Sequence, residues 1–180
     1  MVIKKILSEE KTNLYRWARM LALFTVFYNI IEGLVSVYFG VKDETLSLFG
    51  FGIDSFVEVI SGIGIWHMLI RIKAKGEERD EFEKRALKIT GTAFYILVAG
   101  LIISAVYNAL TYHKPETTFW GIVISLVSII SMGLLIHYKL KVGRALDSQA
   151  IIADANCTKT CLYLSIILLA SSVGYEYCPV

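Results

Sequence analysis

Two pairs of side chains with the chemistry of metal ligands lie within long apolar stretches of the sequence. Asp54 and Glu58 stand in "GFGIDSFVEV", and Cys157 and Cys161 stand in "IADANCTKTC". Residues four apart lie on one face of a helix, so each pair points two donor groups in one direction. Two carboxylates and two thiolates together suit a tetrahedral, borderline-soft divalent ion such as zinc or cadmium. The spacing therefore predicts one metal site built by two helices.

Three further ionisable residues lie near these pairs. Asp154 precedes Cys157 by three residues and so joins the cysteine face, where we expect it to carry a proton or to support the ligands without binding the ion itself. Glu32 belongs to a stripe of polar and small residues, and it is expected to face the bundle interior as a proton carrier or as a partner of Lys159. Lys159 lies about 140° around a helix from Asp154. We therefore expect Lys159 to pair with another helix and to stay outside the metal cluster.

A structural interpretation of the same residues is also open. A charge at the centre of a bilayer costs roughly 2.5–3.5 kcal/mol, so Asp54 and Glu58 need a partner, and an ion pair with Lys159 would serve. Cysteine is a common small apolar residue in helices, so Cys157 and Cys161 can be packing residues. A disulfide between these two cysteines is disfavoured, because a regular helix directs their side chains poorly for the S–S torsion.

The composition indicates a membrane protein. Of 180 residues, 56% are hydrophobic and 19% charged, and the mean hydropathy is +0.60. We expect an all-α, polytopic helical bundle with five transmembrane helices, because a lipid-exposed backbone must satisfy its own hydrogen bonds. Residues 1–180 form one transmembrane domain with no soluble domain in this prediction. The expected spans are Trp17 to Phe39, Leu46 to Ile70, Ile89 to Leu110, Thr118 to Tyr138 and Ser148 to Val173.

Basic residues predict the orientation of these spans. Fifteen lie on the side of the N-terminus and of the connections between spans two and three and between spans four and five, against Lys42 and Lys114 on the other side. The positive-inside rule places the N-terminus in the cytoplasm, in a bacterial inner membrane or its equivalent. The opening residues predict no cleavable targeting segment. A net charge of +2 gives no reason to expect a nucleic-acid partner.

The depth of the two ligand pairs supports a shared site. Spans two and five run in opposite directions, and each pair lies about ten residues from the end of its span, close to the midplane. Small residues on other spans are expected to allow close helix packing. These are Gly100 and Ser104 on span three, and Gly121, Ser125, Ser128 and Met132 on span four.

With both patterns placed, the chain resembles the membrane domain of the cation diffusion facilitator family. The second helix of that family carries H/D-S-x-x-D, and "DSFVE" fills this motif with Asp54 and Glu58 at the ligand positions. The fifth helix carries A-D-A-x-H-x-x-x-D, and "ADANCTKTC" matches its first three residues and its spacing. Cys157 and Cys161 occupy the other two ligand positions. The resemblance covers essentially the whole chain.

The resemblance implies a secondary transporter that exports a divalent metal from the cytoplasm in exchange for protons, and it implies a homodimer. The metal is the substrate, and no cofactor is expected. Cysteines in place of His and Asp imply a softer preference, for zinc or cadmium, with mercury and copper(I) as further alternatives. Family members normally have six membrane helices, often followed by a cytoplasmic metal-binding domain, whereas five spans are predicted here.

Two other classes of function remain open. A membrane thiol oxidoreductase would use Cys157, Cys161 and Cys178 and would need a reachable thiol, although no C-x-x-C or cofactor motif occurs. A non-transporting membrane subunit would keep the metal site without moving the ion. We expect no enzyme activity, and nucleotide-driven pumping is disfavoured because no phosphate-binding glycine loop is present.

Overall fold

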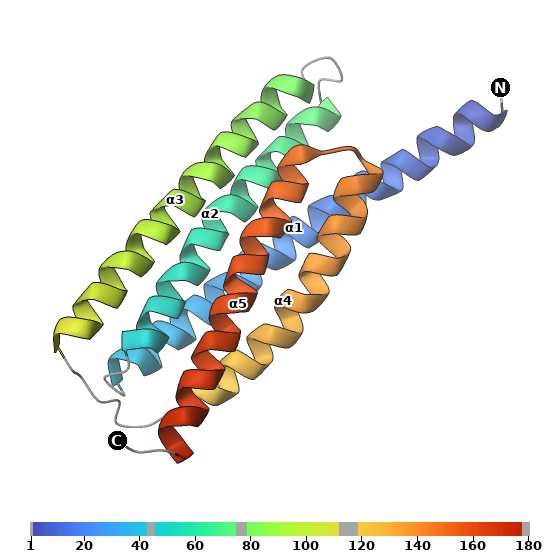
Figure 1. Ribbon diagram of the computed structural model, residues 1–180. Helices are drawn as coiled ribbons and strands as arrows, with labels where there is room; N and C mark the ends of the chain where they lie inside the picture. Colours follow the sequence, from blue (N-terminus) through green and yellow to red (C-terminus); the bar gives the residue numbers. More distant parts are fainter. Residues whose placement is uncertain (1, 43–45, 75–78, 112–118, 178–180) are drawn as a thin grey trace.

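The computed structural model describes residues 2–42, 46–74, 79–111 and 119–177, and these residues form five α-helices (Figure 1). The helices run side by side, and the first turns of α1 project beyond the bundle. The fold agrees with the predicted helical bundle. The helices are α1 (Val2–Lys42), α2 (Leu46–Ala74), α3 (Arg79–Thr111), α4 (Phe119–Ala145) and α5 (Gln149–Tyr177).

The first helix shows why these segments assemble in lipid. Its polar residues Asn29, Glu32 and Ser36 recur at helical spacing and are buried, whereas Phe27 and Ile31 are exposed. This distribution is the reverse of a water-soluble helix, in which the apolar face turns inward. Exposed apolar surface on this scale suits contact with lipid chains. The described helices contain no proline, so none of them loses a backbone hydrogen bond to proline.

Four of the helices are long and apolar enough to cross a membrane over their described residues, within α1, α2, α4 and α5. This result fits a multi-pass membrane protein. The fifth predicted span corresponds to α3, whose apolar part begins near Ile89 and includes residues with undescribed side chains. Its crossing of the membrane stays a prediction, as does the cytoplasmic location of the N-terminus.

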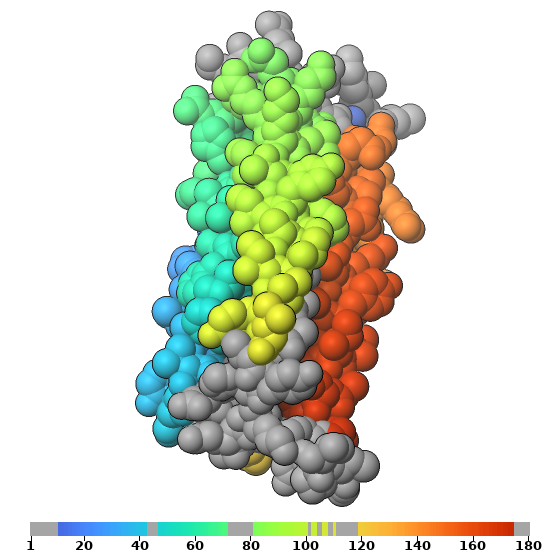
Figure 2. Space-filling view, turned by 60° about the vertical axis from the view of Figure 1, so that its left-hand side comes forward, coloured from blue at the N-terminus to red at the C-terminus, as the bar shows by residue number. Residues whose placement is uncertain are grey.

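Helices α2 and α5 occupy the middle of the arrangement. Helix α2 packs against α1, α3 and α5, while α5 packs against α4, α3 and α2. Helix α1 also contacts α4, so the outer helices enclose the α2–α5 contact. Figure 2 shows α3 lying along the junction between α2 and α5. The two helices that carry the predicted ligands are therefore antiparallel neighbours in the interior.

Glycine allows α1 and α2 to approach very closely. A Cβ atom at Gly40 would lie 2.5 Å from the backbone nitrogen of Phe49, and one at Gly52 would lie 2.8 Å from the backbone nitrogen of Val37. Real Cβ atoms do not come so near to backbone atoms, so larger residues would force the helices apart. The close approach sets α1 beside the carboxylates of α2.

The small residues predicted to pack on α4 do so, whereas one on α3 does not. Gly121, Ser125, Ser128 and Met132 are all buried. A Cβ at Gly121 would lie 2.6 Å from a serine hydroxyl of α5. By contrast, a Cβ at Gly100 would meet nothing within 4 Å, so the predicted close packing there is wrong. Gly100 instead lines a cavity between α2 and α3. The side chain of Ser104, its predicted companion, lies outside the described residues.

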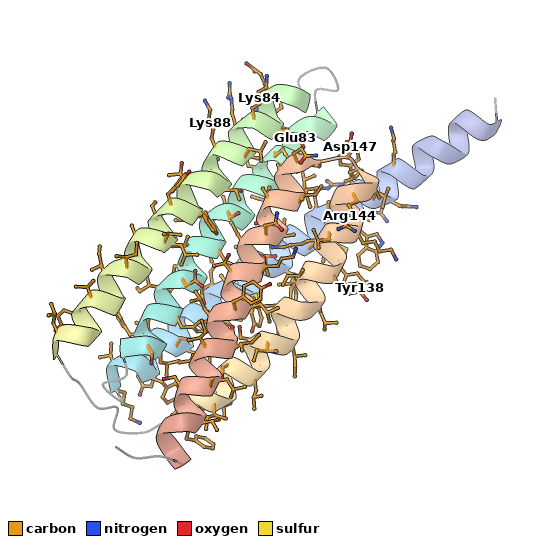
Figure 3. All side chains as sticks on the ribbon, in the orientation of Figure 1. Glu83, Lys84, Lys88, Tyr138, Arg144 and Asp147 are labelled. Carbon is orange, nitrogen blue, oxygen red and sulfur yellow. The ribbon has the colours of Figure 1, made fainter. Side chains whose placement is uncertain are left out.

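A tight turn connects α4 to α5. Asp147 has a positive φ of 49°, and its amide donates to the carbonyl of Arg144 while the amide of Ser148 donates to the carbonyl of Gly143. This pair of bonds is a Schellman motif, which satisfies the last carbonyls of a helix. The carboxylate of Glu83 on α3 then accepts bonds from the Ser148 hydroxyl (2.8 Å) and the amide of residue 150 (3.3 Å). Figure 3 labels Glu83, Arg144 and Asp147 at this end of the bundle.

Apolar side chains close the bundle on both sides of its polar middle. The larger cluster joins α1, α2, α3, α4 and α5 at the end where α3 begins, and a smaller cluster joins α2, α4 and α5 at the other end. The buried polar residues lie between these two clusters along the bundle. The larger cluster includes Ala18, Ile65, Met68, Leu69, Phe82, Val142 and Ile151, and the smaller includes Leu48, Phe51, Ile124 and Leu168.

Candidate metal centre

The four predicted ligands lie inside the bundle. Asp54 and Glu58 on α2 are 2% and 3% exposed, and Cys157 and Cys161 on α5 are 8% and 1% exposed. The Cys161 thiol is close enough to interact with both carboxyl groups of α2. Cys157 interacts electrostatically with the same carboxylates at longer range. The structure thus places the predicted ligands of both helices in the interior, with Cys161 of α5 beside the two carboxyl groups of α2.

Several oxygen atoms of these carboxylates have no hydrogen-bond partner. Both oxygens of Asp54 and Oε1 of Glu58 are fully buried and receive no hydrogen bond of regular geometry. Buried polar atoms are nearly always satisfied in proteins, so each exception calls for an explanation such as a missing ion. Across the described residues, however, no three His, Cys, Asp or Glu side chains are close enough to hold a metal as they stand. The ligand assignment therefore stays a prediction.

Lys139 of α4 forms the buried ion pair of this region. Its Nζ lies 2.8 Å from Oδ2 of Asp154 and donates to the hydroxyl of Thr158 at 2.9 Å. Lys139 is only 2% exposed. The distribution of basic residues in the sequence had instead assigned it to the aqueous connection between spans four and five. Lys159, the cation predicted to enter a buried pair, is partly exposed instead. Lys159 was predicted to pair with Glu32 or with Asp54 and Glu58, whereas the buried ion pair of this region joins Lys139 to Asp154.

Asp154 is saturated by its neighbours. Besides the ammonium on Oδ2, its Oδ1 accepts a 2.6 Å hydrogen bond from the hydroxyl of Ser61 on α2. That hydroxyl also lies 3.0 Å from the hydroxyl of Thr90 on α3. Asp154 therefore ties together α2, α3, α4 and α5. Both of its oxygens already have partners, so Asp154 is better suited to an accessory role, in which it holds the helices together and balances the charge of Lys139, than to binding the metal.

Glu32 of α1 is held by neutral donors. The hydroxyl of Tyr28 donates to Oε1 at 2.8 Å, and the hydroxyl of Ser55 on α2 donates to Oε2 at 3.0 Å. Both oxygens are thus occupied, and no lysine takes part in these bonds. One helical turn earlier, the amide of Asn29 donates to Oε2 of Glu58 at 2.9 Å. The predicted interior stripe of α1 is therefore in direct contact with the carboxylates of α2.

Sequence reasoning missed the position of Lys139 for an identifiable reason. A lysine near the end of a span has a long, flexible stem and normally reaches water. The available signal was Asp154, because a carboxylate deep in a span requires a cation or a proton. Counting along the antiparallel helices α4 and α5 from their short turn would have placed Lys139 at a similar depth.

Both described cysteines, Cys157 and Cys161, are free thiols, in agreement with the prediction against a disulfide. Their burial leaves little surface for a substrate to reach. Cys178, which the thiol-exchange alternative also uses, lies outside the described residues. The arrangement suits ligation or packing better than exchange with an external disulfide.

Comparison with known proteins gives several distant relatives, two of which are described here. The chain is 27% identical over 152 residues to an uncharacterized transporter, MJ0449, of Methanocaldococcus jannaschii, covering 82% of this chain and 54% of the relative. It is 26% identical over 176 residues to the manganese efflux system protein MneP of Bacillus subtilis, covering 89% of this chain and 58% of the relative. No family model matches the sequence. The chain thus spans a little over half the length of these relatives, one of which is named as a transporter and the other as an efflux system protein.

Proposed function

We propose that this chain is the membrane part of a metal efflux transporter, with the ion bound between α2 and α5 by Asp54, Glu58, Cys157 and Cys161. The observation that carries the proposal is the set of buried, unpartnered carboxylate oxygens of Asp54 and Glu58 beside the free thiol of Cys161. Leaving such groups unsatisfied costs stability, and a cation between the two helices would satisfy them.

The charge of the interior favours a cation as cargo. Four carboxylates are buried in the described bundle, from Glu32, Asp54, Glu58 and Asp154, against the single buried lysine, Lys139. Lys139 compensates one of them through its pair with Asp154. The remaining excess is negative and lies within lipid depth, where uncompensated charge is costly. A divalent ion offsets two of these charges at once.

The thiols favour zinc or cadmium among divalent ions, since sulfur ligands select softer metals over magnesium or calcium. The distant relative named for manganese efflux makes Mn²⁺ the ion to compare against them. We expect proton exchange to follow from the ligands themselves, because carboxylates and thiols must lose their protons to bind a metal. The homodimer implied by the family resemblance is part of the same proposal.

Metal binding to the purified, detergent-solubilised protein tests the site. Equilibrium dialysis should give about one Zn²⁺ or Cd²⁺ per chain, and the Cys157→Ala/Cys161→Ala variant should lose Cd²⁺ binding. The control is Ser128→Ala, which removes a buried hydroxyl between α4 and α5 instead of a ligand. Unchanged Cd²⁺ affinity in the double variant would show that the thiols are packing residues.

Flux into proteoliposomes separates transport from binding alone. A pH gradient imposed across the vesicle membrane should drive Cd²⁺ or Zn²⁺ uptake in the wild type, and Asp54→Asn should abolish it. Stoichiometric binding without any flux, under gradients of either direction, would indicate a non-transporting metal-binding subunit instead.

A further inference from the structure

The contact between Asn29 and Glu58 has a chemical consequence for the proposed site. Asn29 lies on α1, a helix that contributes none of the four predicted ligands, and it is completely buried. Its Nδ2 donates to the carbonyl of Thr25 at 2.9 Å and to Oε2 of Glu58 at 2.9 Å. Both amide hydrogens are thereby used.

These two bonds also fix the orientation of the carboxamide. The nitrogen and oxygen of an asparagine side chain are distinguished by their partners. Turning the group over would place Oδ1 against a carbonyl and a carboxylate, two acceptors with no hydrogen to share. The oxygen of Asn29 is therefore the atom left over, and it is buried with no hydrogen-bond partner.

Oδ1 of Asn29 lies in the same region as the unpartnered carboxylate oxygens. The nitrogen and oxygen of one carboxamide are about 2.3 Å apart, so Oδ1 lies no more than about 5 Å from Oε2 of Glu58, given the 2.9 Å bond. The other unpartnered oxygens nearby are those of Asp54 and Oε1 of Glu58. Helices α1 and α2 thus both hold buried oxygens without a hydrogen-bond partner in this part of the interior, and a cation between them would account for such atoms.

We propose that Oδ1 of Asn29 is a further ligand of the transported ion, so that three helices, α1, α2 and α5, bind it. This inference rests on the proposed function and names a determinant of its selectivity. A neutral amide oxygen is a hard donor of the kind that Mn²⁺ and Ca²⁺ accept, whereas the thiols of α5 favour Cd²⁺ and Zn²⁺. The site therefore has an oxygen side, from α1 and α2, and a sulfur side from α5.

The experiment compares two substitutions with opposite expected signs. Asn29→Asp keeps an oxygen at the same reach and adds a negative charge, so a ligand role predicts Mn²⁺ affinity raised about tenfold or more. Asn29→Leu has a similar volume and no oxygen, so it should lower Mn²⁺ affinity about tenfold and Cd²⁺ affinity less. Both affinities are measured by equilibrium dialysis of the full chain in detergent.

A purely positioning role gives a different pattern. If Asn29 serves only to donate to Glu58, Asn29→Asp removes that donor and sets one carboxylate against another, so both variants should weaken Mn²⁺ and Cd²⁺ binding alike. That result overturns the proposal, as does unchanged binding of both ions in both variants. An unchanged size-exclusion profile and an unchanged far-ultraviolet circular dichroism spectrum show that a variant is folded.

The failure of this inference is distinguishable from failure of the proposed function. The proposed function fails if Cys157→Ala/Cys161→Ala and Asp54→Asn leave metal binding unchanged. If those variants lose binding while the ratio of Mn²⁺ to Cd²⁺ affinity is the same in Asn29→Asp, Asn29→Leu and the wild type, only the role of Asn29 is wrong. Ser36→Ala is the matched control, since Ser36 is a buried, unpartnered residue of the same helix, two turns further along.

Discussion

Breaking the ion pair between Lys139 and Asp154 should destabilise the bundle strongly. The two charged groups are 2.8 Å apart, and their side chains are 2% and 3% exposed. With an effective dielectric constant of about 20, the attraction at this distance is about 6 kcal/mol. Desolvation of the two ions offsets most of that, so the pair as a whole contributes little net stability.

Removing one partner is different, because the other charge stays buried without compensation. We expect Lys139→Met alone, or Asp154→Leu alone, to lower the free energy of unfolding by about 3–5 kcal/mol. Lys139→Met also removes the hydrogen bond to Thr158, and Asp154→Leu removes the one from Ser61. The double variant Lys139→Met/Asp154→Leu should be within about 1–2 kcal/mol of the wild type, since no unpaired charge is left.

The assay is SDS-induced equilibrium unfolding of the purified protein in mixed micelles, with all four proteins compared as a double-mutant cycle. Lys141→Met serves as the control, because Lys141 is an exposed lysine on the same helix and its loss should change stability by less than about 0.5 kcal/mol. The reasoning is refuted if Lys139→Met costs under about 1 kcal/mol, or if the double variant is as unstable as the sum of the single variants.

Four further predictions follow from the packing and from the proposed ligands. Gly40→Ala should destabilise by about 1–3 kcal/mol because its Cβ would clash with Phe49, whereas Gly133→Ala, which meets nothing within 4 Å, should be neutral or slightly stabilising in the same unfolding assay. Ser148→Ala should cost about 1 kcal/mol, because it removes the hydroxyl that donates to the Glu83 carboxylate; a loss below about 0.3 kcal/mol would count against a role for this hydrogen bond. Met68→Ala should cost about 2–5 kcal/mol through a cavity in the larger apolar cluster, without changing Cd²⁺ affinity. Cd²⁺ affinity should rise with pH between about pH 6 and 8, and a flat profile would contradict ligation by groups that must lose protons.

The sequence predicted the helices well because apolar length and the absence of proline determine them locally. It also predicted that Asp54 and Glu58 share one face and Cys157 and Cys161 another, since helical periodicity follows from spacing alone. The sequence alone could not predict which hydrogen-bond or ion-pair partner each buried polar side chain has. Lys139 illustrates this limit, because its burial depends on the register between α4 and α5.

Asn29, which we propose as a further ligand, shows the same limit. Its place on an interior stripe follows from the sequence, but the bond to Glu58 depends on the distance between α1 and α2. That distance is set by close contacts at Gly40 and Gly52 with the opposing backbone. Glycines in a span indicate close packing in general without indicating which helix approaches.

The buried charges also constrain how an ion and protons exchange. Lys139 compensates Asp154, and Glu32 is held by two neutral hydroxyls, so Asp54 and Glu58 are the carboxylates left facing the thiols. A divalent ion bound by these two carboxylates alone would leave no net charge. Binding by two thiolates would leave a charge of −2 inside the bilayer, which is costly unless protons are taken up nearby. When the ligands carry more negative charge than the bound ion can neutralise, protons must bind nearby to offset the excess. Metal binding at such a site is therefore coupled to proton binding by the ligands themselves.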